Sequence, residues 1–399
     1  MEYVTLELRL ETPFLPGSVH PAAPDPDWPL RPSEVKGLWR WWARALAAGA
    51  LFERGLLRGA GGKDVVKTPT REEADCISQI VGLDMGLGHA GERGAQASCF
   101  RIRFEQVSFA PPKSVPQSLA KRLQRVRLLT LGGRELQYID RGSATLVVEE
   151  HTPCSLDGRS VEAALGALAL ALRLSCFGKG GRRGLGCFSV RAHGRYSALF
   201  AEEPKALIKR AVDAAGAVVD RATARCRRLR RRSLSSCELP PMPTLSVARR
   251  YDACIKESAV LTPYMLIAVR GARWEGLHNF FLRPTRARVL HGDYSAQDAL
   301  RQALKAWILG LPREQKGTGY RILGGASRRA SPLMLAVAGS TAYLSVFVSA
   351  DWPRELEWRG NGRQKIAVGE REILEATALA LREFLDYVKK LGGAAETWP

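Results

Sequence analysis

The segment RPSEVKGLWRWWARAL (31–46) places cations and tryptophans at helical spacing. Lys36, Arg40 and Arg44 are four residues apart, so on a helix they form one narrow stripe, and apolar side chains cover the opposite face. Like charges at this spacing destabilise a helix. A stripe that carries three of them predicts an anionic partner such as a phosphate backbone. The alternative is a solvated basic face on a core helix.

A second segment, CFGKGGRRGLGCF (176–188), is rich in glycine and positive charge. Glycine lets a backbone come close to a ligand, and the cations supply charge. Dinucleotide-binding loops and P-loops follow a strand and open a helix, whereas this segment follows an expected helix and enters an expected strand. It predicts a clamp on a single-stranded sugar-phosphate backbone, with a flexible glycine turn as the alternative. The clamp residues are Lys179, Gly180, Gly181, Arg182, Arg183 and Gly184.

Further cations and aromatics lie in the second half of the chain. GGASRRASPL (324–333) places Arg328 and Arg329 before an expected strand, and with Arg313 and Arg321 they could form the other wall of an RNA cleft. The alternative is an exposed loop. Trp41 and Tyr320 are candidates to stack on bases, whereas Trp39 and Trp42 should be buried. The run RCRRLRRR (225–232) is expected at a helix end, where cations suit the helix dipole without a ligand.

The composition is that of a folded protein with an unusual charge. Of the 399 residues 46% are hydrophobic and 25% charged, which excludes a disordered or collagen-like chain. Lys plus Arg number 60 and Asp plus Glu 40, a net charge of +20. Such a charge favours polyanions, nucleic acid before a membrane surface, and the excess of Arg over Lys favours bidentate phosphate recognition. A merely basic or thermophilic surface is the alternative.

The sequence contains no pattern typical of a metal site or a redox-active cysteine pair. The eight cysteines contain no CxxC pair, so we expect no zinc site, and we interpret them as buried thiols in a reducing compartment. Asp25 and Asp27 have no third ligand nearby for a catalytic metal. No cofactor is expected. The N-terminus has no signal-peptide core, and the longest apolar run (163–172) is too short to cross a bilayer, so a cytoplasmic protein without membrane partners is predicted.

The order of expected elements in the first half is β-α-β-β-α-β. Strands are predicted from alternating apolar residues at 4–10, 100–105, 144–149 and 187–191. Helices are predicted at 33–48, with Ser33 as N-cap, and at 161–176. This is the ferredoxin-like, RRM-like arrangement. The segments 55–94 and 109–142 are interpreted as insertions.

The second half is predicted to repeat this unit imperfectly. A helix over 204–232 and a Pro-rich linker (238–243) should join the halves. Strands are then expected at 264–269, 333–337 and 343–348, with helices at 295–309 and 370–391. No last strand is visible. The predicted division is a first ferredoxin-like unit (1–200), a linking region (201–243) and a second unit (244–399), an α+β fold.

RPSEVKGLWRWWARAL, the GKGGRRGLG loop and GLPREQ…RRASPL (310–333) together resemble the RAMP superfamily of CRISPR proteins. More narrowly, they resemble the family of first subunits of type III-B Cmr effector complexes. The resemblance implies a non-catalytic subunit at the head of the complex, beside another RAMP subunit. It also implies contact with the 3′ region of the guide RNA or the guide–target duplex, and support of target RNA capture in antiviral defence. Guide RNA, target RNA and other Cmr subunits would be the partners.

The resemblance also carries an enzymatic alternative. Some RAMP proteins cut guide RNA without metal, using a histidine as general acid or base. His20, in the loop after the first strand, could fill that role because histidine titrates near neutral pH. A histidine beside proline in a loop can equally be a simple loop residue.

Overall fold

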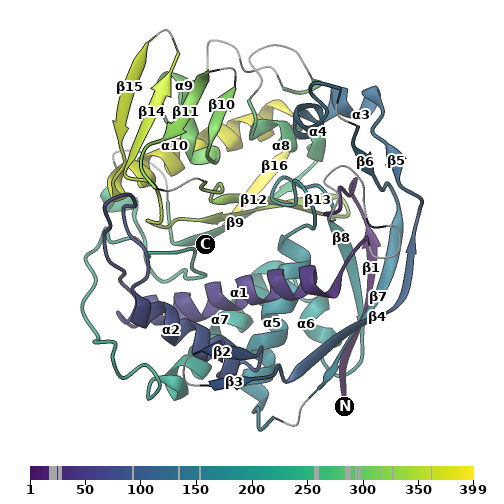
Figure 1. The fold of residues 1–399 in the computed structure, drawn as a ribbon, viewed down its shortest axis with the longest axis vertical. Helices are drawn as coiled ribbons and strands as arrows, with labels where there is room; N and C mark the ends of the chain where they lie inside the picture. The colour runs from purple at the N-terminus through teal and green to yellow at the C-terminus, as the bar shows by residue number, and fades with distance from the viewer. Residues whose placement is uncertain are drawn as a thin grey trace.

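The computed structural model describes residues 1–17, 25, 29–91, 94–133, 135–151, 154–255, 260–283, 289–292, 294, 298–315, 317–325, 328–360 and 362–399. Helices and antiparallel sheets are mixed, which confirms the α+β fold class. Figure 1 shows one sheet at the right edge of the molecule and a second above the central helices. No helix in the described part of the chain is long and apolar enough to cross a membrane.

The first unit has the expected βαββαβ order. Its sheet has the strand order β4-β7-β1-β8, and every neighbouring pair is antiparallel. The elements are β1 (Glu2–Leu10), α1 (Pro32–Glu53), β4 (Phe100–Phe109), β7 (Gly142–Glu150), α5 (Gly158–Leu174) and β8 (Phe188–His193). Helix α1 begins at Pro32, so Ser33 lies in its first turn and is not the N-cap.

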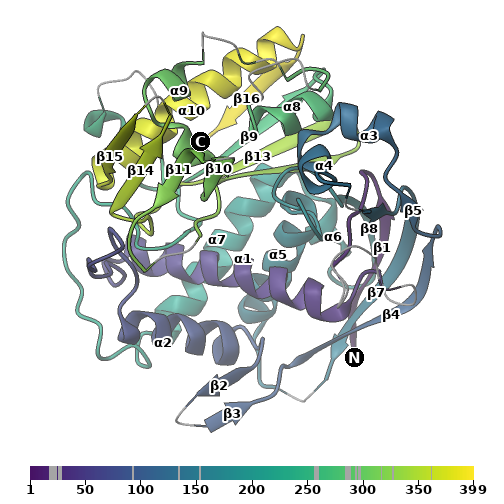
Figure 2. The ribbon, with the colours of Figure 1, turned by 45° about the horizontal axis from the view of Figure 1, so that its top comes forward.

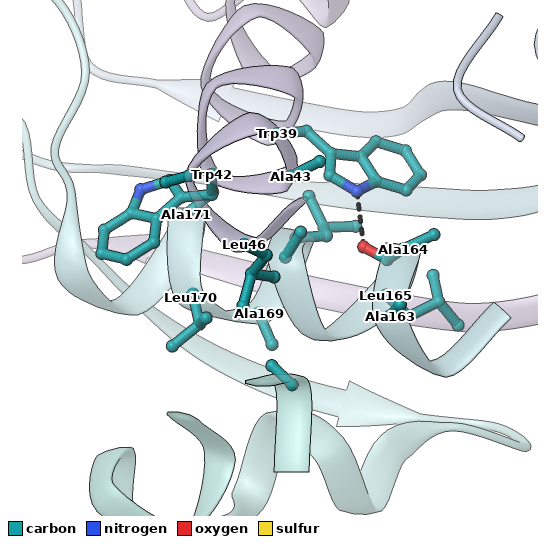
Figure 3. Close-up of a cluster of buried hydrophobic side chains, with 14 of the residues drawn as sticks. Trp39, Trp42, Ala43, Leu46, Ala163, Ala164, Leu165, Ala169, Leu170 and Ala171 are labelled. Carbon is teal, nitrogen blue, oxygen red and sulfur yellow. Dashed lines mark hydrogen bonds between the residues drawn. The ribbon is translucent and has the colours of Figure 1, made fainter. Parts of the chain in front are cut away.

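Helices α1 and α5 cross in the core of this unit (Figure 3). Alanine-rich α5 lets α1 come close, and the indole nitrogen of Trp39 donates a hydrogen bond of 2.6 Å to the carbonyl oxygen of Ala164. The Trp42 indole donates to Ser175 Oγ at 2.8 Å. Both tryptophans are buried, as expected. Helix α7 (Pro204–Ala222) packs on α5 and ends earlier than residue 232, the predicted end.

The second unit repeats this order and contains the last strand that the sequence did not reveal. The strand order is β12-β13-β9-β16, again antiparallel. The elements are β9 (Tyr264–Arg270), α8 (Trp274–Phe280), β12 (Leu333–Ala338), β13 (Thr341–Phe347), α10 (Glu370–Lys390) and β16 (Ala394–Trp398). Strand β16 is largely exposed, so its side chains show no apolar alternation. The expected helix at 295–309 is wrong: its described part forms the short α9 (Ala299–Gln302) and a 3-10 turn, η3 (Ala306–Leu309).

The second sheet is buried on both faces. Tyr264 and Phe347 face the first unit, where the Trp42 ring centre lies 6.4 and 5.5 Å from theirs. Ile267 and Val346 face the opposite way and pack with α10 and α8. This explains why β9, β12 and β13 are almost continuously apolar. One face of the second sheet therefore belongs to the hydrophobic core of the first unit, and the other face belongs to a separate core of the second unit.

A third sheet stands on the second unit and was not expected. It contains β10 (Arg313–Gln315), β11 (Thr318–Ile322), β14 (Glu355–Arg359) and β15 (Arg363–Ala367), in the order β10-β11-β14-β15 (Figure 2). Its strands are short and half polar, which is why their sequence looked like loop.

Both predicted insertions are folded. The first contains α2 (Arg71–Gln79), the π-helical turn η1 (Ile80–Asp84) and the hairpin of β2 (His89–Gly91) and β3 (Gly94–Gln96). The second contains β5 (Lys113–Ser114), α3 (Gln117–Arg122), α4 (Gln124–Leu129) and β6 (Gln137–Tyr138). Figure 1 shows α3 and α4 beside α8, so the second insertion reaches the second unit.

The expectation of buried free thiols is wrong, because all eight cysteines form disulfides. The pairs are Cys76–Cys226, Cys99–Cys154, Cys176–Cys187 and Cys237–Cys254. Their partners lie 150, 55, 11 and 17 residues apart, so no short spacing motif marks them. The cysteines therefore give no indication of a reducing compartment.

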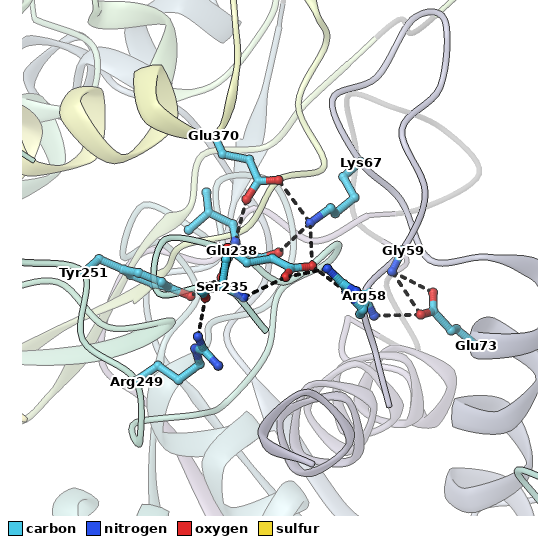
Figure 4. A network of polar contacts seen from close by, with 10 residues as sticks. Arg58, Gly59, Lys67, Glu73, Ser235, Glu238, Arg249, Tyr251 and Glu370 are labelled. Carbon is cyan, nitrogen blue, oxygen red and sulfur yellow. Dashed lines mark hydrogen bonds and ion pairs between the residues drawn. The ribbon is translucent and has the colours of Figure 1, made fainter. Parts of the chain in front are cut away.

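A buried carboxylate ties the first insertion to the linker and to α10 (Figure 4). Glu238 accepts two hydrogen bonds of 2.9 Å from Arg58, and Lys67 lies 3.3 Å from Glu238 and 3.0 Å from Glu370. Burial raises the pKa of Glu238, but Arg58 and Lys67 together outweigh it and lower that pKa. A pocket of about 710 Å³ opens here. These contacts neutralise its innermost charges, so we assign the network a structural role.

The position of Trp42 between α5 and the second sheet predicts the effect of its removal. Trp42→Ala should lower the free energy of unfolding by about 3–5 kcal/mol, since it removes a fully buried indole and leaves a cavity. Chemical denaturation measures this. Trp41→Ala is the control, because Trp41 is only partly buried. Equal losses in the two variants would contradict the central role of Trp42.

Candidate nucleic-acid interface

The cationic stripe on α1 is only partly available at the surface. Lys36 and Arg44 are exposed. Arg40, between them, is partly buried and donates a hydrogen bond to the carbonyl oxygen of Gly88 in the first insertion. Burial, and to a lesser extent Arg44, lowers the pKa of Arg40. Arg40 is thus engaged within the protein, whereas Lys36 and Arg44 remain available to a ligand.

The glycine-rich loop is rigid. The Cys176–Cys187 disulfide closes its base, and the Gly178 amide donates to Glu34 Oε1 at 2.7 Å, which holds the loop at the start of α1. Gly180 and Gly184 have positive φ angles of +84° and +77°, which strain other residues, and a Cβ added at Gly181 would lie only 2.3 Å from the Cys176 oxygen. The conformation of the loop therefore favours glycine at all three positions.

The two arginines of the loop reach the second unit. The Arg182 carbonyl accepts a hydrogen bond from the Leu335 amide at 3.1 Å. The guanidinium group of Arg182 lies 5.4 Å from the centre of the Trp41 ring. Arg183 Nη2 donates to the Leu309 carbonyl at 2.7 Å, and its guanidinium lies 4.1 Å from the Phe281 ring centre. Burial lowers the pKa of Arg182 to about 10. Burial, followed by Arg313, Arg182 and Arg125, lowers the pKa of Arg183 strongly.

The other predicted cations do not form one wall. Arg313 pairs with Tyr320 across the β10–β11 hairpin, so Arg321, the next residue along β11, faces the opposite side of that sheet. Arg329 is buried, and its Nη2 lies 2.8 Å from Asp351. Arg328 is exposed. The structure thus brings Arg313 near Arg183, Arg329 near Arg182 and Arg328 near Arg125, and it turns Arg321 away.

The two base-stacking candidates differ. Tyr320 is 4% exposed, too little to offer a ring face to a base. Trp41 is partly exposed and packs edge-on against Phe347. The outward residues of the first sheet provide no platform either, because β1, β4, β7 and β8 carry no Phe, Tyr or Trp there. Those positions include Arg101 and Arg103, which both approach Glu149.

A cluster of arginines gathers where the loop, the second insertion and the second unit meet. We define the arginine cluster as Arg125, Arg183, Arg313 and Arg328. After burial, the charges of Arg313 and Arg125 lower the pKa of Arg183, and the charge of Arg328 lowers the pKa of Arg125. Burial is the larger effect on Arg125, and burial, followed by Arg301 and Arg283, lowers the pKa of Arg313 to about 10. Arg125 was missed from sequence, where it is one cation among several in an insertion.

Helix α8 holds this junction together. His278 Nδ1 donates to the Arg183 carbonyl at 2.8 Å, and Nε2 accepts from the Arg125 amide at 3.2 Å, which is the neutral form of the ring. Asn279 Oδ1 accepts from the Gln124 amide at 2.8 Å. Burial, followed by Arg183 and Arg125, lowers the pKa of His278 to about 4, although its bond to the Arg183 carbonyl opposes this.

The catalytic candidates gain nothing from the structure. His20 and Asp27 lie outside the described residues. Within the described ranges, no group of three or more His, Cys, Asp or Glu side chains could hold a metal ion.

Residues 7–189 match the family model of the RAMP superfamily. The first unit belongs to the RAMP superfamily. This confirms the resemblance that the basic helix and the glycine-rich loop suggested. No curated protein matches the chain.

The whole chain is similar in structure to Cmr1 from Pyrococcus furiosus in its apo form. Sequence identity is 16%, 98% of each chain is covered, and the TM-score is 0.51. It is also similar to chains in two cryo-EM structures of the Type III-B Cmr-beta bound to cognate target RNA, one of them with AMPPnP and in the presence of ssDNA. For these, identities are 13% and 10%, coverage is 95% and 97% of this chain and 99% of theirs, and both TM-scores are 0.51. At sequence identities this low, the structural similarity shows that these chains share a fold.

The buried, neutral His278 predicts a pH dependence of stability. Its folded pKa of about 4 lies below the ordinary 6.5, so between these values the unfolded chain binds a proton that the folded chain excludes. This contribution is complete above pH 6.5 and is lost as pH falls toward 4. From pH 7.5 to 5, wild type should lose about 2 kcal/mol more stability than His278→Gln, measured by denaturant unfolding. Parallel losses would contradict the neutral histidine.

Proposed function

We propose that this protein is a non-catalytic, RNA-binding subunit of a type III-B Cmr ribonucleoprotein. In this proposal it contacts the 3′ region of the guide RNA, or the guide–target duplex, at the head of the complex. It lies beside another RAMP subunit and supports target RNA capture in antiviral defence. Guide RNA, target RNA and the other Cmr subunits are its partners.

The observation that carries RNA binding is the arginine cluster. Cations from three segments converge there, and in the described part of the chain Arg125, Arg313 and Arg328 form no ion pair with a carboxylate. Desolvated like charges are unfavourable unless an anion joins them. The net charge of +20 points to the same class of ligand. The likeness to Cmr1 and to chains of an RNA-bound Cmr assembly, over nearly the full length, supports the choice of complex.

The surface next to the cluster extends the proposed RNA path. Lys36 and Arg44 are exposed along α1, and the glycine-rich loop that carries Lys179 is fixed at the start of the same helix. A single strand that follows α1 past the loop would pass Trp41 and Arg182 before it reaches the arginine cluster. Phosphate contacts along this path give sequence-tolerant binding.

The salt dependence of RNA binding tests the path. Lys36→Gln combined with Arg44→Gln should weaken binding of single-stranded RNA about tenfold at low salt. It should also reduce the slope of log affinity against log salt concentration by about 1.4, since two phosphate contacts are lost. Fluorescence anisotropy over a salt series measures both.

Arg230→Gln combined with Arg231→Gln is the matched control, because it removes the same charge from the basic run 225–232, which follows α7 within the linking region. We expect it to change the slope little. If it weakens binding as much as the α1 variant, the RNA follows the linker and the proposed path is wrong.

The endoribonuclease alternative makes the opposite prediction about RNA integrity. We expect the purified protein to leave guide-repeat RNA intact in EDTA and in Mg²⁺, as gel electrophoresis of end-labelled RNA would show. Specific cleavage in EDTA that is abolished by His20→Ala would establish the alternative and overturn the non-catalytic role.

A further inference from the structure

The arginine cluster is assembled by main-chain contacts that converge from three parts of the chain. His278 joins the Arg183 carbonyl to the Arg125 amide. Arg183 Nη2 donates a hydrogen bond to the Leu309 carbonyl. Two residues farther along the chain, the Leu311 amide donates to the Arg329 carbonyl at 2.8 Å. Arg313 follows Leu311 by two residues, and Arg328 precedes Arg329. These contacts bring together the three segments that carry the four side chains.

Neighbouring arginines show how this protein neutralises a buried cation when no ligand is needed. Arg283 is 1% exposed and lies 2.6 Å from Asp298 and 3.0 Å from Glu383. Arg329 has Asp351 at 2.8 Å. Among the described residues, no carboxylate forms an ion pair with Arg125, Arg313 or Arg328, although Asp298 attracts Arg313 from a longer distance. Arg125, Arg183 and Arg313 are partly exposed and Arg328 fully so, which leaves the cluster open to a solute.

We propose that Arg125, Arg183, Arg313 and Arg328 form a binding site for one phosphoryl group. The inference rests on the proposed function for the source of that group, a backbone phosphate of the bound RNA. Guanidinium groups suit this ligand because their paired N–H donors match the oxygens of a phosphate. The repulsion that Arg313 and Arg125 exert on Arg183, and Arg328 on Arg125, supports the site, since a bound anion would relieve it.

Such a site would do more than add affinity. Its cations come from the glycine-rich loop, the second insertion and the second unit, so one phosphate would bridge all three. A ligand that binds only the folded arrangement raises its stability. Phosphate binding should therefore be visible as thermal stabilisation, even without RNA.

The first experiment uses inorganic phosphate as the probe and the full-length protein. Phosphate should raise the melting temperature of wild type by roughly 2 °C more than chloride at equal ionic strength. Arg125→Gln and Arg313→Gln should abolish this difference. Arg321→Gln is the matched control, since Arg321 is exposed on the opposite face of the same hairpin. Without phosphate, Arg313→Gln should melt no lower than wild type, because it removes a repelling charge.

RNA binding by the same variants separates this inference from the proposed function. We expect Arg313→Gln to bind single-stranded RNA about tenfold more weakly than Arg321→Gln. An undiminished phosphate effect in both cluster variants would refute the site, whether or not RNA binds. A cluster-dependent phosphate effect in a protein that binds no RNA would keep the site and overturn the proposed function. Phosphate stabilisation lost without any change in RNA affinity would refute the backbone phosphate as its source.

Discussion

The burial of the second sheet on both faces is the constraint on which the rest of the structure depends. On one side Trp42 of α1 meets Tyr264 and Phe347, and on the other side α10 covers Ile267 and Val346. Because α1 serves the cores of both units, the units cannot separate without exposing large aromatic side chains. The junction between them is therefore a fixed place, and the glycine-rich loop and second insertion are built onto it.

This fixed junction explains how like charges can gather at one spot. Close arginines repel, and an exposed loop would swing them apart into water. Here the loop is closed by a disulfide, joined to α1 through Glu34, and bonded to the second unit through Arg183. The free energy of packing holds the cations together against their repulsion, so that an anion meets a preorganised set of donors.

The first unit could largely be predicted from sequence, because its sheet has one buried face and its strands alternate with period two. The same reasoning failed for β16, whose exposed side chains carry no pattern, and for the short polar strands of the third sheet. The candidate site was half predictable. The glycine-rich loop and Arg313 could be identified from the sequence. The strand register that turns Arg321 away and the hydrogen bond that engages Arg40 depend on tertiary structure, which the sequence pattern does not show. Arg125 and the disulfides depend on partners distant in sequence.

The packed glycines change what such a loop contributes to binding. A flexible loop must lose conformational entropy when it closes on a ligand, at about 1–2 kcal/mol per ordered residue. In this loop Gly180 and Gly184 have positive φ angles that strain other residues, and Gly181 lies too close to the Cys176 oxygen to carry a side chain. Their lack of a Cβ serves the fold of the loop first, and the loop in turn orients Arg183. The glycines thus allow the loop to adopt the conformation that positions its cations. Specificity for phosphate comes from the positions of those cations.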